Sequence, residues 1–385
     1  MLHLRCFSSK RERDVVDHIM EEEHNNLDLE GQIRAWQATM AMVYTMSLRC
    51  AVELGIPDIV NGAARVALPV SRIAALLSPT PPCDHSALHR LLRFLAHKGV
   101  FAERVDPSTG EPAYAPTPTS RWFSCRSELS LASMVLLQTW SFQESPWHRL
   151  LERVVRCGGD GEGVGAPPHK KEDPWANLAA VPECAAVFNS AMAGMSGIAM
   201  RAVMAVYKGG FEGIRTLVDV GGGTGAVLKE ITEQCPNIRG INFDLPHVVA
   251  AAPECPHVEH VGGSVFDGIP DGDAIFMKLL LHCFDDEGCL RILKNCQKAM
   301  PRKYGKLIIV DAVLGADDDN DDGSLEDDGS LEDMKKTFDM LMLVYTGGKE
   351  RTEAEWRKLL CSGGFPRCNI IRIPSFLSII EAFAE

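Results

Sequence analysis

The chain has 385 residues, a length that favours two domains, and its 46% of hydrophobic and 24% of charged residues are typical of a globular protein. No apolar run reaches the roughly 18 to 20 residues of a membrane-spanning helix, and the first residues lack the apolar core of a signal peptide, so we predict a cytoplasmic protein. The net charge is −13, but ten acidic side chains lie in Ala316–Asp333 and without them it is −3, a near balance that excludes a general nucleic-acid-binding surface.

The first predicted element is a helix over Ile33–Leu54, which Gly55 and Pro57 end. Its residues are apolar on nearly every side. We therefore expect this helix to be buried, either in a core or against a partner subunit.

A winged-helix motif is predicted after it. Two short helices, over Val66–Leu77 and from His85 onward, are followed by an extended segment with a turn at Asp106–Gly110. Winged helices often bind DNA, and the second helix carries several basic side chains (His89, Arg90, Arg93, His97 and Lys98). A DNA-binding regulator is therefore one alternative for this protein.

A break in the pattern divides the chain into two predicted domains. The segment Cys157–Asp173 is rich in glycine, proline and charge and is predicted to be a loop. We place a mostly helical domain at residues 1–185 and a second domain at residues 186–385.

Strands and helices alternate from Thr216 onward. Such alternation predicts an α/β fold with a mainly parallel sheet covered on both faces, and ligands bind such sheets at the carboxyl ends of the strands. The predicted strands are Thr216–Val220, Gly240–Leu245, Ala274–Leu281, Lys306–Leu314, Asn369–Ile373 and Ser378–Ala384, and the predicted helices are Ala226–Gln234, Val248–Ala252 and Glu287–Met300.

An acidic insert is predicted at residues 316–333. It holds the repeat DGSLED twice, and its beginning imitates a calcium-binding loop. The position that needs a bidentate glutamate is Gly329, so we predict a solvated, flexible loop without calcium.

The thirteen cysteines form no CxxC pair. Cys283, Cys289 and Cys296 share one segment, but their spacing suits no standard zinc site. We predict reduced thiols and no metal.

The run Leu217–Gly225 (LVDVGGGTG) is the strongest chemical signal. Its glycines follow a strand and precede a helix, where they let the backbone turn tightly and approach a ligand. Gly221 and Gly223 with Ala226 also satisfy the dinucleotide fingerprint, which leaves an NAD-dependent oxidoreductase open.

Two acids near this loop bear on that choice. Asp219 places a carboxylate at the end of the first strand, where it would repel a pyrophosphate and attract the ammonium and sulfonium of S-adenosylmethionine. Asp244 ends the second strand and fits the ribose of either cofactor. The pair therefore favours S-adenosylmethionine without excluding the dinucleotide.

Several motifs, in this order, closely resemble those of the plant small-molecule O-methyltransferases of the caffeic acid and flavonoid type. They are LVDVGGGTGAVLKEI, GINFDLPHV, HVEHVGGSVF, DAIFMKLLLHCFDDEGCLRILKNC and GGKERTEAEW, and the resemblance covers essentially the whole chain. It implies a Rossmann-like methyltransferase domain that follows a winged-helix-like dimerisation domain. It also implies S-adenosyl-L-methionine as cofactor, a homodimer, and no need for a metal.

The resemblance assigns a cofactor role to several residues. Gly221 lies at the glycine loop and Asp244 matches the acid that binds the ribose. Phe266 matches an aromatic beside the adenine, and Lys278 matches a lysine at a strand end that contacts the cofactor. Two positions depart from the family: Ser264 stands where the family usually has an acid, and Phe284 replaces a Trp but keeps an aromatic that can pack on the cofactor.

The resemblance also identifies His282 as the general base that removes the phenolic proton. Glu350 matches a family glutamate that flanks the base, and Asp311 stands where the family usually has Glu. Because Asp is one methylene shorter, we expect it to reach the histidine less well. Cys283 replaces a family acid directly after the base.

Four apolar residues match family positions that line the acceptor pocket, namely Phe188, Met192, Leu341 and Met342. Met195 replaces a polar family residue and Gln138 lies near a family Asn, so we predict a small planar phenolic without naming it. The departures at Ser264, Cys283 and Asp311 leave a further alternative, a catalytically weakened homologue that binds a ligand or a sister subunit.

Overall fold

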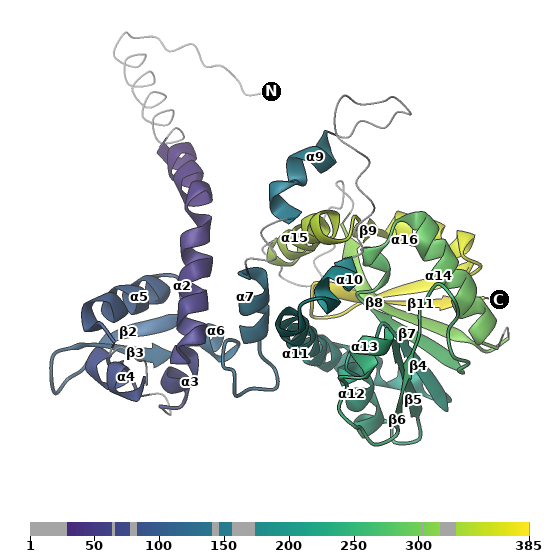
Figure 1. Cartoon of the computed structure of the whole chain (residues 1–385), viewed down its shortest axis with the longest axis horizontal. Helices are drawn as coiled ribbons and strands as arrows, with labels where there is room; N and C mark the ends of the chain where they lie inside the picture. Colours follow the sequence, from purple (N-terminus) through teal and green to yellow (C-terminus); the bar gives the residue numbers. More distant parts are fainter. Residues whose placement is uncertain are drawn as a thin grey trace, which may run out of the picture. The chain divides into compact units, whose positions relative to one another are not determined.

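The computed structural model describes residues 29–63, 66–77, 83–140, 146–155, 174–301, 303–315 and 329–384 (Figure 1). Contacts within the chain divide it at Ser120–Arg121 into two compact units, each of which is described by itself. None of the described helices is long and apolar enough to cross a membrane. The loop predicted over Cys157–Asp173 lies outside the described residues.

The first unit has the predicted winged-helix arrangement. Helices α4 (Val70–Leu76) and α5 (His85–His97) precede a hairpin of β2 (Phe101–Val105) and β3 (Pro112–Pro116), and β1 (Leu68–Pro69) pairs with β3. The side chain of Asp84 begins α5 by accepting hydrogen bonds from the backbone of Ser86 and Ala87, and Leu88, Leu92 and Leu95 bury one face of that helix. Two further helices are α3 (Ile56–Asn61) and α6 (Pro118–Arg121).

The long N-terminal helix is apolar but largely uncovered. Residues 29–39 are helical, a turn follows at Met40, and α2 spans Ala41–Glu53. Only Leu48, Ala51 and Val52 of α2 are buried, whereas Trp36 is 61% and Met42 72% exposed. The helix was expected to be buried in a core or against a partner subunit. Within the chain, only its C-terminal end is buried in a core.

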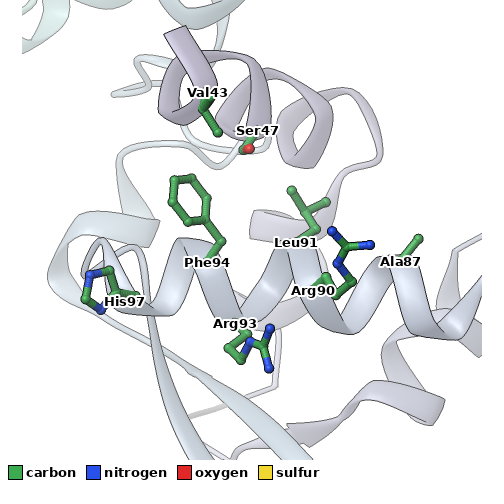
Figure 2. A pocket seen from close by; sticks show the side chains of 8 residues that line it. All are labelled: Val43, Ser47, Ala87, Arg90, Leu91, Arg93, Phe94 and His97. Carbon is green, nitrogen blue, oxygen red and sulfur yellow. The ribbon is translucent and has the colours of Figure 1, made fainter. Parts of the chain in front are cut away.

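A groove lies between α2 and α5 in this unit. Figure 2 shows Val43 and Ser47 of α2 facing a row of α5 side chains: Ala87, Arg90, Leu91, Arg93, Phe94 and His97. Phe94 and Leu91 point toward α2. The groove thus combines an apolar floor with cationic edges.

The second unit is built on a mainly parallel sheet, as predicted. Its strands run in the order β10-β11-β8-β7-β4-β5-β6, with β9 beside β8. The pairs β10–β11 and β11–β8 are antiparallel, and the other pairs of this order, as well as β8–β9, are parallel. Their bounds are β4 Thr216–Val220, β5 Arg239–Asp244, β6 Val258–Gly262, β7 Ala274–Lys278, β8 Lys306–Leu314, β9 Arg351–Thr352, β10 Arg367–Arg372 and β11 Leu377–Phe383.

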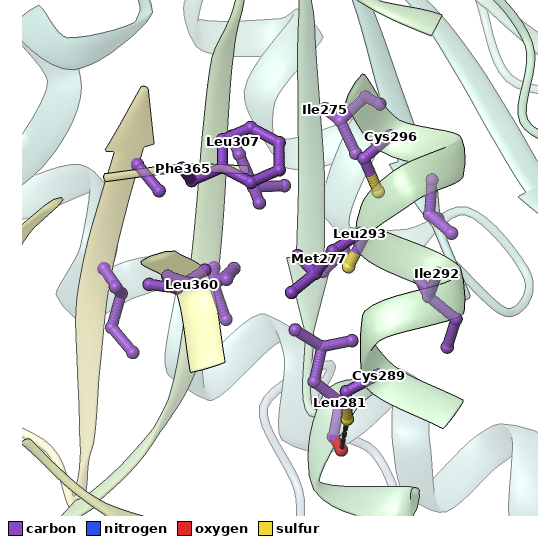
Figure 3. Packing of buried hydrophobic residues seen from close by; sticks show 14 of the residues in the cluster. Ile275, Met277, Leu281, Cys289, Ile292, Leu293, Cys296, Leu307, Leu360 and Phe365 are labelled. Carbon is purple, nitrogen blue, oxygen red and sulfur yellow. Dashed lines mark hydrogen bonds between the residues drawn. The ribbon is translucent and has the colours of Figure 1, made fainter. Parts of the chain in front are cut away.

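Helices cover both faces of this sheet. One buried cluster joins the strands to α14 (Asp286–Ala299) and α16 (Glu353–Ser362), with Met277, Leu293 and Phe365 among its members (Figure 3). A second cluster joins the opposite face to α11 (Pro182–Tyr207) and α12 (Ala226–Gln234). Among the described residues, this unit also contains the helices α7 (Ala132–Gln138), α9 (Leu150–Val154), α10 (Pro174–Ala179), α13 (Pro246–Val249) and α15 (Ser330–Tyr345).

Several predicted element boundaries are wrong. The strand predicted to reach Leu281 ends at Lys278, because Leu279 adopts a left-handed φ of 53° and the chain then forms the 3-10 turn Leu281–Cys283. Strand β6 was not predicted, since this edge strand is only half-buried and lacks a continuous apolar run. The helix α13 begins two residues before its predicted start.

The acidic insert is also shorter than predicted. Residues 316–328 lie outside the described residues, but Ser330–Asp333 form the first turn of α15. Glu332 and Asp333 favour this turn because carboxylates stabilise a helix N-terminus. Helix α11 passes through residues 185 and 186 without a break, and the domain limits at 1–185 and 186–385 stay a prediction.

Candidate active site

The glycine loop joins β4 to α12 at the carboxyl edge of the sheet. Gly221, Gly223 and Gly225 have φ values of 73°, 58° and 86°, which side chains other than glycine rarely tolerate. A Cβ at Gly222 would lie 2.1 Å from the amide oxygen of Asn242. The loop therefore needs its glycines for conformation and for space.

Asp219 lies under this loop with an unsatisfied oxygen. Its side chain is 1% exposed, and its Oδ2 has no hydrogen-bond partner among the described residues. Burial raises the pKa of Asp219 to about 7, against the opposing charge of Lys278 and with a smaller contribution from Asp244. A buried carboxyl of this kind fits a cationic ligand, which is the property that a sulfonium cofactor requires.

Asp244 shapes the loop as well as facing it. Its Oδ2 accepts a hydrogen bond from the backbone N–H of Gly223 at 2.8 Å, and its Oδ1 accepts one from Leu245 at 2.7 Å. Burial raises the pKa of Asp244, and these two hydrogen bonds oppose the increase. The structure thus brings the predicted ribose acid against the predicted glycine loop.

Asn242 is a buried support of the loop that sequence reasoning missed. Its Nδ2 donates to the carbonyl of Gly223 at 2.9 Å and lies 3.0 Å from Nδ1 of His260. Since Nδ2 is a donor, Nδ1 of His260 accepts, and its Nε2–H donates to the carbonyl of Pro253 at 3.1 Å. Asn242 lies inside the motif GINFDLPHV, but the motif alone does not show that its side chain contacts the glycine loop.

The predicted adenine-side residues also come together. Phe266 and Phe284 pack edge to face, with ring centroids 5.3 Å apart, and the Arg291 guanidinium lies 4.6 Å from the Phe266 ring. The hydroxyl of Ser264 accepts a hydrogen bond from the backbone of Phe266 at 3.3 Å. Ser264 therefore holds the turn on which Phe266 stands.

Two buried carboxylates lie near the same ring nitrogen of His282. Its Nδ1 is 2.7 Å from Oε1 of Glu350 and 3.6 Å from Oδ1 of Asp311. The three side chains are 3%, 2% and 0% exposed, in the order His282, Glu350 and Asp311. Glu350 is thus the direct partner of the imidazole, and Asp311 stays farther away, as its shorter side chain predicts.

The charges of this cluster determine the basicity of the histidine. Burial lowers the pKa of His282, but the neighbouring Asp311, Cys283 and Glu350 outweigh it and hold that pKa well above its ordinary value. Burial also raises the pKa of Asp311 to about 7, opposed by His282 and increased by Glu350. The two carboxylates therefore favour the protonated, cationic imidazolium of His282.

Lys278 lies at the end of β7, between the two acidic groups. Burial lowers its pKa, while Asp219, Asp311 and Cys283 raise it. Lys278 thus interacts electrostatically both with Asp219 under the glycine loop and with Asp311 beside His282.

Among the described residues, His282, Asp311 and Glu350 form a group whose possible ligand atoms lie close enough together to hold a metal ion. Those atoms of His282, Asp311 and Glu350 are within 4.8 Å of one another. The 2.7 Å from Nδ1 to Glu350 is a hydrogen-bond length, whereas two ligands of a tetrahedral zinc lie about 3.4 Å apart. The arrangement as it stands is that of a hydrogen-bonded base.

The predicted acceptor-pocket residues occupy two helices. Phe188 and Met192 lie one turn apart on α11, Leu341 and Met342 are neighbours on α15, and all four are half-buried. Phe188 packs edge to face on Trp175, with centroids 6.0 Å apart. Their role in binding an acceptor stays a prediction.

Gln138 contributes to a polar contact with α15. The Tyr345 hydroxyl donates to Oε1 of Gln138 at 3.4 Å and accepts from the indole N–H of Trp147 at 2.9 Å. Trp147 and Tyr345 also pack edge to face. Sequence reasoning missed both aromatic side chains; Tyr345 stands on α15, one helical turn beyond Leu341 and Met342.

Comparisons with known proteins match both halves of the chain. A family model described as an O-methyltransferase domain matches residues 147–366, and one described as an O-methyltransferase dimerisation domain matches residues 36–125. The (R,S)-reticuline 7-O-methyltransferase of Papaver somniferum is 42% identical over 93% of this chain and 98% of its own length. The desmethylxanthohumol 6'-O-methyltransferase of Humulus lupulus is 38% identical over 92% and 99%.

A solved structure shows the same fold. The human N-acetylserotonin methyltransferase, in complex with S-adenosylmethionine, superposes with a TM-score of 0.73 at 21% identity, and the match covers 92% of this chain and 97% of that one. The two-domain architecture is therefore shared along nearly the full length of both chains.

Proposed function

Because the chain belongs to the family of S-adenosyl-L-methionine-dependent O-methyltransferases, we propose that it methylates a phenolic hydroxyl of a small molecule with His282 as the general base. The dimerisation domain at residues 36–125 supports a homodimer, with the exposed apolar side chains of the N-terminal helix as part of the contact. Family membership replaces the dinucleotide oxidoreductase and the DNA-binding regulator as explanations of the chain.

The acceptor class rests on two supports. The relatives are named for reticuline and desmethylxanthohumol as methyl acceptors. In this chain, half-buried apolar residues on α11 and α15, together with the aromatic pair Trp147 and Tyr345, suit a flat, largely apolar ring. We infer a phenylpropanoid, flavonoid or related phenolic.

The cofactor site fits its ligand by charge and by space. Bound S-adenosyl-L-methionine supplies the electrophilic methyl group. The loop of Gly221 and Gly223 gives its backbone close access, Asp244 offers a carboxylate to the ribose, and the buried carboxyl of Asp219 favours positive charge. Phe266 and Phe284 offer aromatic faces to the adenine, next to Ser264.

The observation that carries the proposal is the buried hydrogen bond between His282 and Glu350. A phenol with a pKa of about 10 and a free imidazole of about 6.5 leave proton transfer uphill by roughly 5 kcal/mol. The carboxylates of Glu350 and Asp311 raise the pKa of His282 and so reduce this difference. With Nδ1–H bound to Glu350, the other ring nitrogen is left to accept the phenolic proton.

The base assignment is tested with His282→Ala and a panel of phenolics with labelled cofactor. We expect turnover to fall by about 100-fold or more, while calorimetric affinity for the cofactor stays near that of the unmodified enzyme. His85→Ala, at an exposed position on α5, is the matched control. Undiminished turnover in His282→Ala would refute the assignment, and cofactor binding by the unmodified enzyme without turnover on any phenolic would favour the weakened homologue.

We also propose that the enzyme works in the cytoplasm. Cys289 and Cys296 are free thiols in the core, which suits a reducing compartment. Fractionation of cells that express a tagged chain tests this, and recovery in a secretory or organellar fraction would contradict it.

A further inference from the structure

We propose that Arg351 is a positioning residue for the reaction, because it fixes the short turn that carries His282. This inference rests on His282 being the base, as argued above. It concerns three consecutive residues, Lys349–Arg351, which hold the turn from one side and are called the clamp below.

The turn that carries His282 has little internal support. Strand β7 ends at Lys278, Leu279 adopts a φ of 53°, and His282 lies in the middle of the 3-10 turn Leu281–Cys283. Single 3-10 turns have poor hydrogen-bond geometry and do not fix a side chain by themselves. The placement of the imidazole therefore depends on contacts from outside the turn.

The clamp supplies those contacts to the backbone. The N–H of Lys349 donates to the carbonyl of His282 at 2.9 Å. Arg351 donates through Nη1 to the carbonyl of Leu281 at 3.3 Å and through Nη2 to that of Phe284 at 3.1 Å. The clamp thus holds the carbonyls of Leu281, His282 and Phe284.

The clamp also holds the imidazole ring. Glu350, between the two backbone contacts, places Oε1 2.7 Å from Nδ1 of His282. Its own backbone N–H donates to Oδ1 of Asp339 on α15 at 2.8 Å. Because one rigid tripeptide fixes both backbone and ring, the position of the free ring nitrogen follows from it.

The guanidinium of Arg351 is suited to this task in a way that an ammonium is not. Arg351 is fully buried, and its planar fork reaches two carbonyls at once, whereas lysine offers a single point charge. Its charge is paired with Asp286, whose Oδ1 lies 2.8 Å from Nη2, and its plane lies 5.5 Å from the Trp356 ring. Cys289 lies 3.5 Å from the same nitrogen.

The test compares Arg351→Lys with Arg357→Lys, which changes an exposed arginine paired with Glu353 on α16. For Arg351→Lys we expect kcat to fall by about 10- to 100-fold while Kd for S-adenosylmethionine and KM for the acceptor change by less than about 3-fold. The acid limb of the kcat–pH profile should move to lower pH, because a loosened contact with Glu350 lowers the pKa of His282. Arg357→Lys should leave all four quantities unchanged.

Two results would overturn the proposal. One is unchanged kcat and pH profile in Arg351→Lys, and the other is a loss of kcat matched by an equal loss of cofactor affinity, which indicates general unfolding. If Arg351→Lys does not fold, Asp286→Asn removes the half-exposed partner that orients the guanidinium, and kcat should fall by about 3- to 10-fold with the same pH shift. Full activity of Asp286→Asn in that case would also overturn it.

The two proposals fail separately. If His282→Ala retains turnover, the base assignment is wrong and the clamp has no catalytic meaning. If His282→Ala abolishes turnover but Arg351→Lys keeps both kcat and the pH profile, the base stands and only the clamp is rejected.

Discussion

Replacing Glu350 by Gln tests how a buried carboxylate contributes to the base. The amide oxygen can still accept the hydrogen bond of His282 Nδ1, so geometry is kept while the charge is lost. A hydrogen bond to a charged group is worth about 1.5–3 kcal/mol and a neutral one about 0.5–1.5 kcal/mol. At 2.7 Å and full burial the difference is about 1–2 kcal/mol, which corresponds to roughly a 5- to 30-fold lower limiting rate.

The pH dependence gives this variant a second signature. His282 must be neutral to accept a proton, and its raised pKa places the acid limb of the unmodified enzyme well above pH 6.5. Glu350 is one of the groups that raise this pKa, so Glu350→Gln should reach a lower plateau at a lower pH. The ratio of the two rates should therefore be largest at high pH and shrink as pH falls.

The assay is kcat/KM and kcat with a phenolic acceptor between pH 6 and 10, with Glu353→Gln as the exposed control. An acid limb that stays in place or moves to higher pH in Glu350→Gln would refute the reasoning. So would a rate ratio that does not change with pH, since that result means the carboxylate acts only through structure.

Three further predictions follow from the buried polar groups. The folded-state pKa of Asp219, about 7, exceeds its ordinary value of 3.8, so ionisation of this carboxyl lowers stability increasingly between pH 4 and 7 and fully above pH 7. Asp219→Asn should therefore raise the melting temperature of the cofactor-free enzyme at pH 8 but not at pH 4. The same variant should weaken cofactor binding at least about 10-fold in calorimetry. Asn242→Leu removes the hydrogen bond to Gly223 and should raise Kd for S-adenosylmethionine about 10-fold, with kcat at saturation within about 3-fold; an unchanged Kd would show that the loop holds itself. Trp356→Phe leaves the carbonyl of Ala312 without its 3.0 Å partner in the core and should lower the free energy of unfolding by about 2–3 kcal/mol in urea titration, whereas a change below about 0.5 kcal/mol would contradict the contact.

The parallel strands could be predicted from sequence because burial on both faces gives continuous apolar runs. Strands β4 and β8 match their predicted limits at both ends, as does helix α12. The half-buried edge strand β6 lacks such a run, and the left-handed Leu279 ends β7 three residues early although three leucines continue the apolar pattern. Local pattern thus identifies what is buried but not where a backbone turns.

The candidate site shows a similar division. His282, Asp311 and Glu350 were identified by resemblance, and the structure brings them within hydrogen-bond or near-contact distance although 68 residues separate His282 from Glu350. Arg351 stands directly beside Glu350 in the motif GGKERT, yet no sequence pattern says that its guanidinium meets the carbonyls of Leu281 and Phe284. The role of Arg351 depends on tertiary contacts with residues that are distant in sequence, and the local motif does not reveal them.

The buried carboxylates of the site have unsatisfied oxygens, and all of them would be stabilised by nearby positive charge. Asp219 Oδ2, Asp311 Oδ2 and Glu350 Oε2 are buried without a hydrogen-bond partner among the described residues, and buried carboxylates of this kind destabilise a folded protein unless positive charge is near. Lys278 interacts with Asp219 and Asp311 but is itself disfavoured as a cation by burial. If S-adenosylmethionine binds beside Asp219 and His282 accepts the phenolic proton, as we propose, each event brings positive charge to one of these buried acids. The buried acids then favour the two events that the proposed reaction requires.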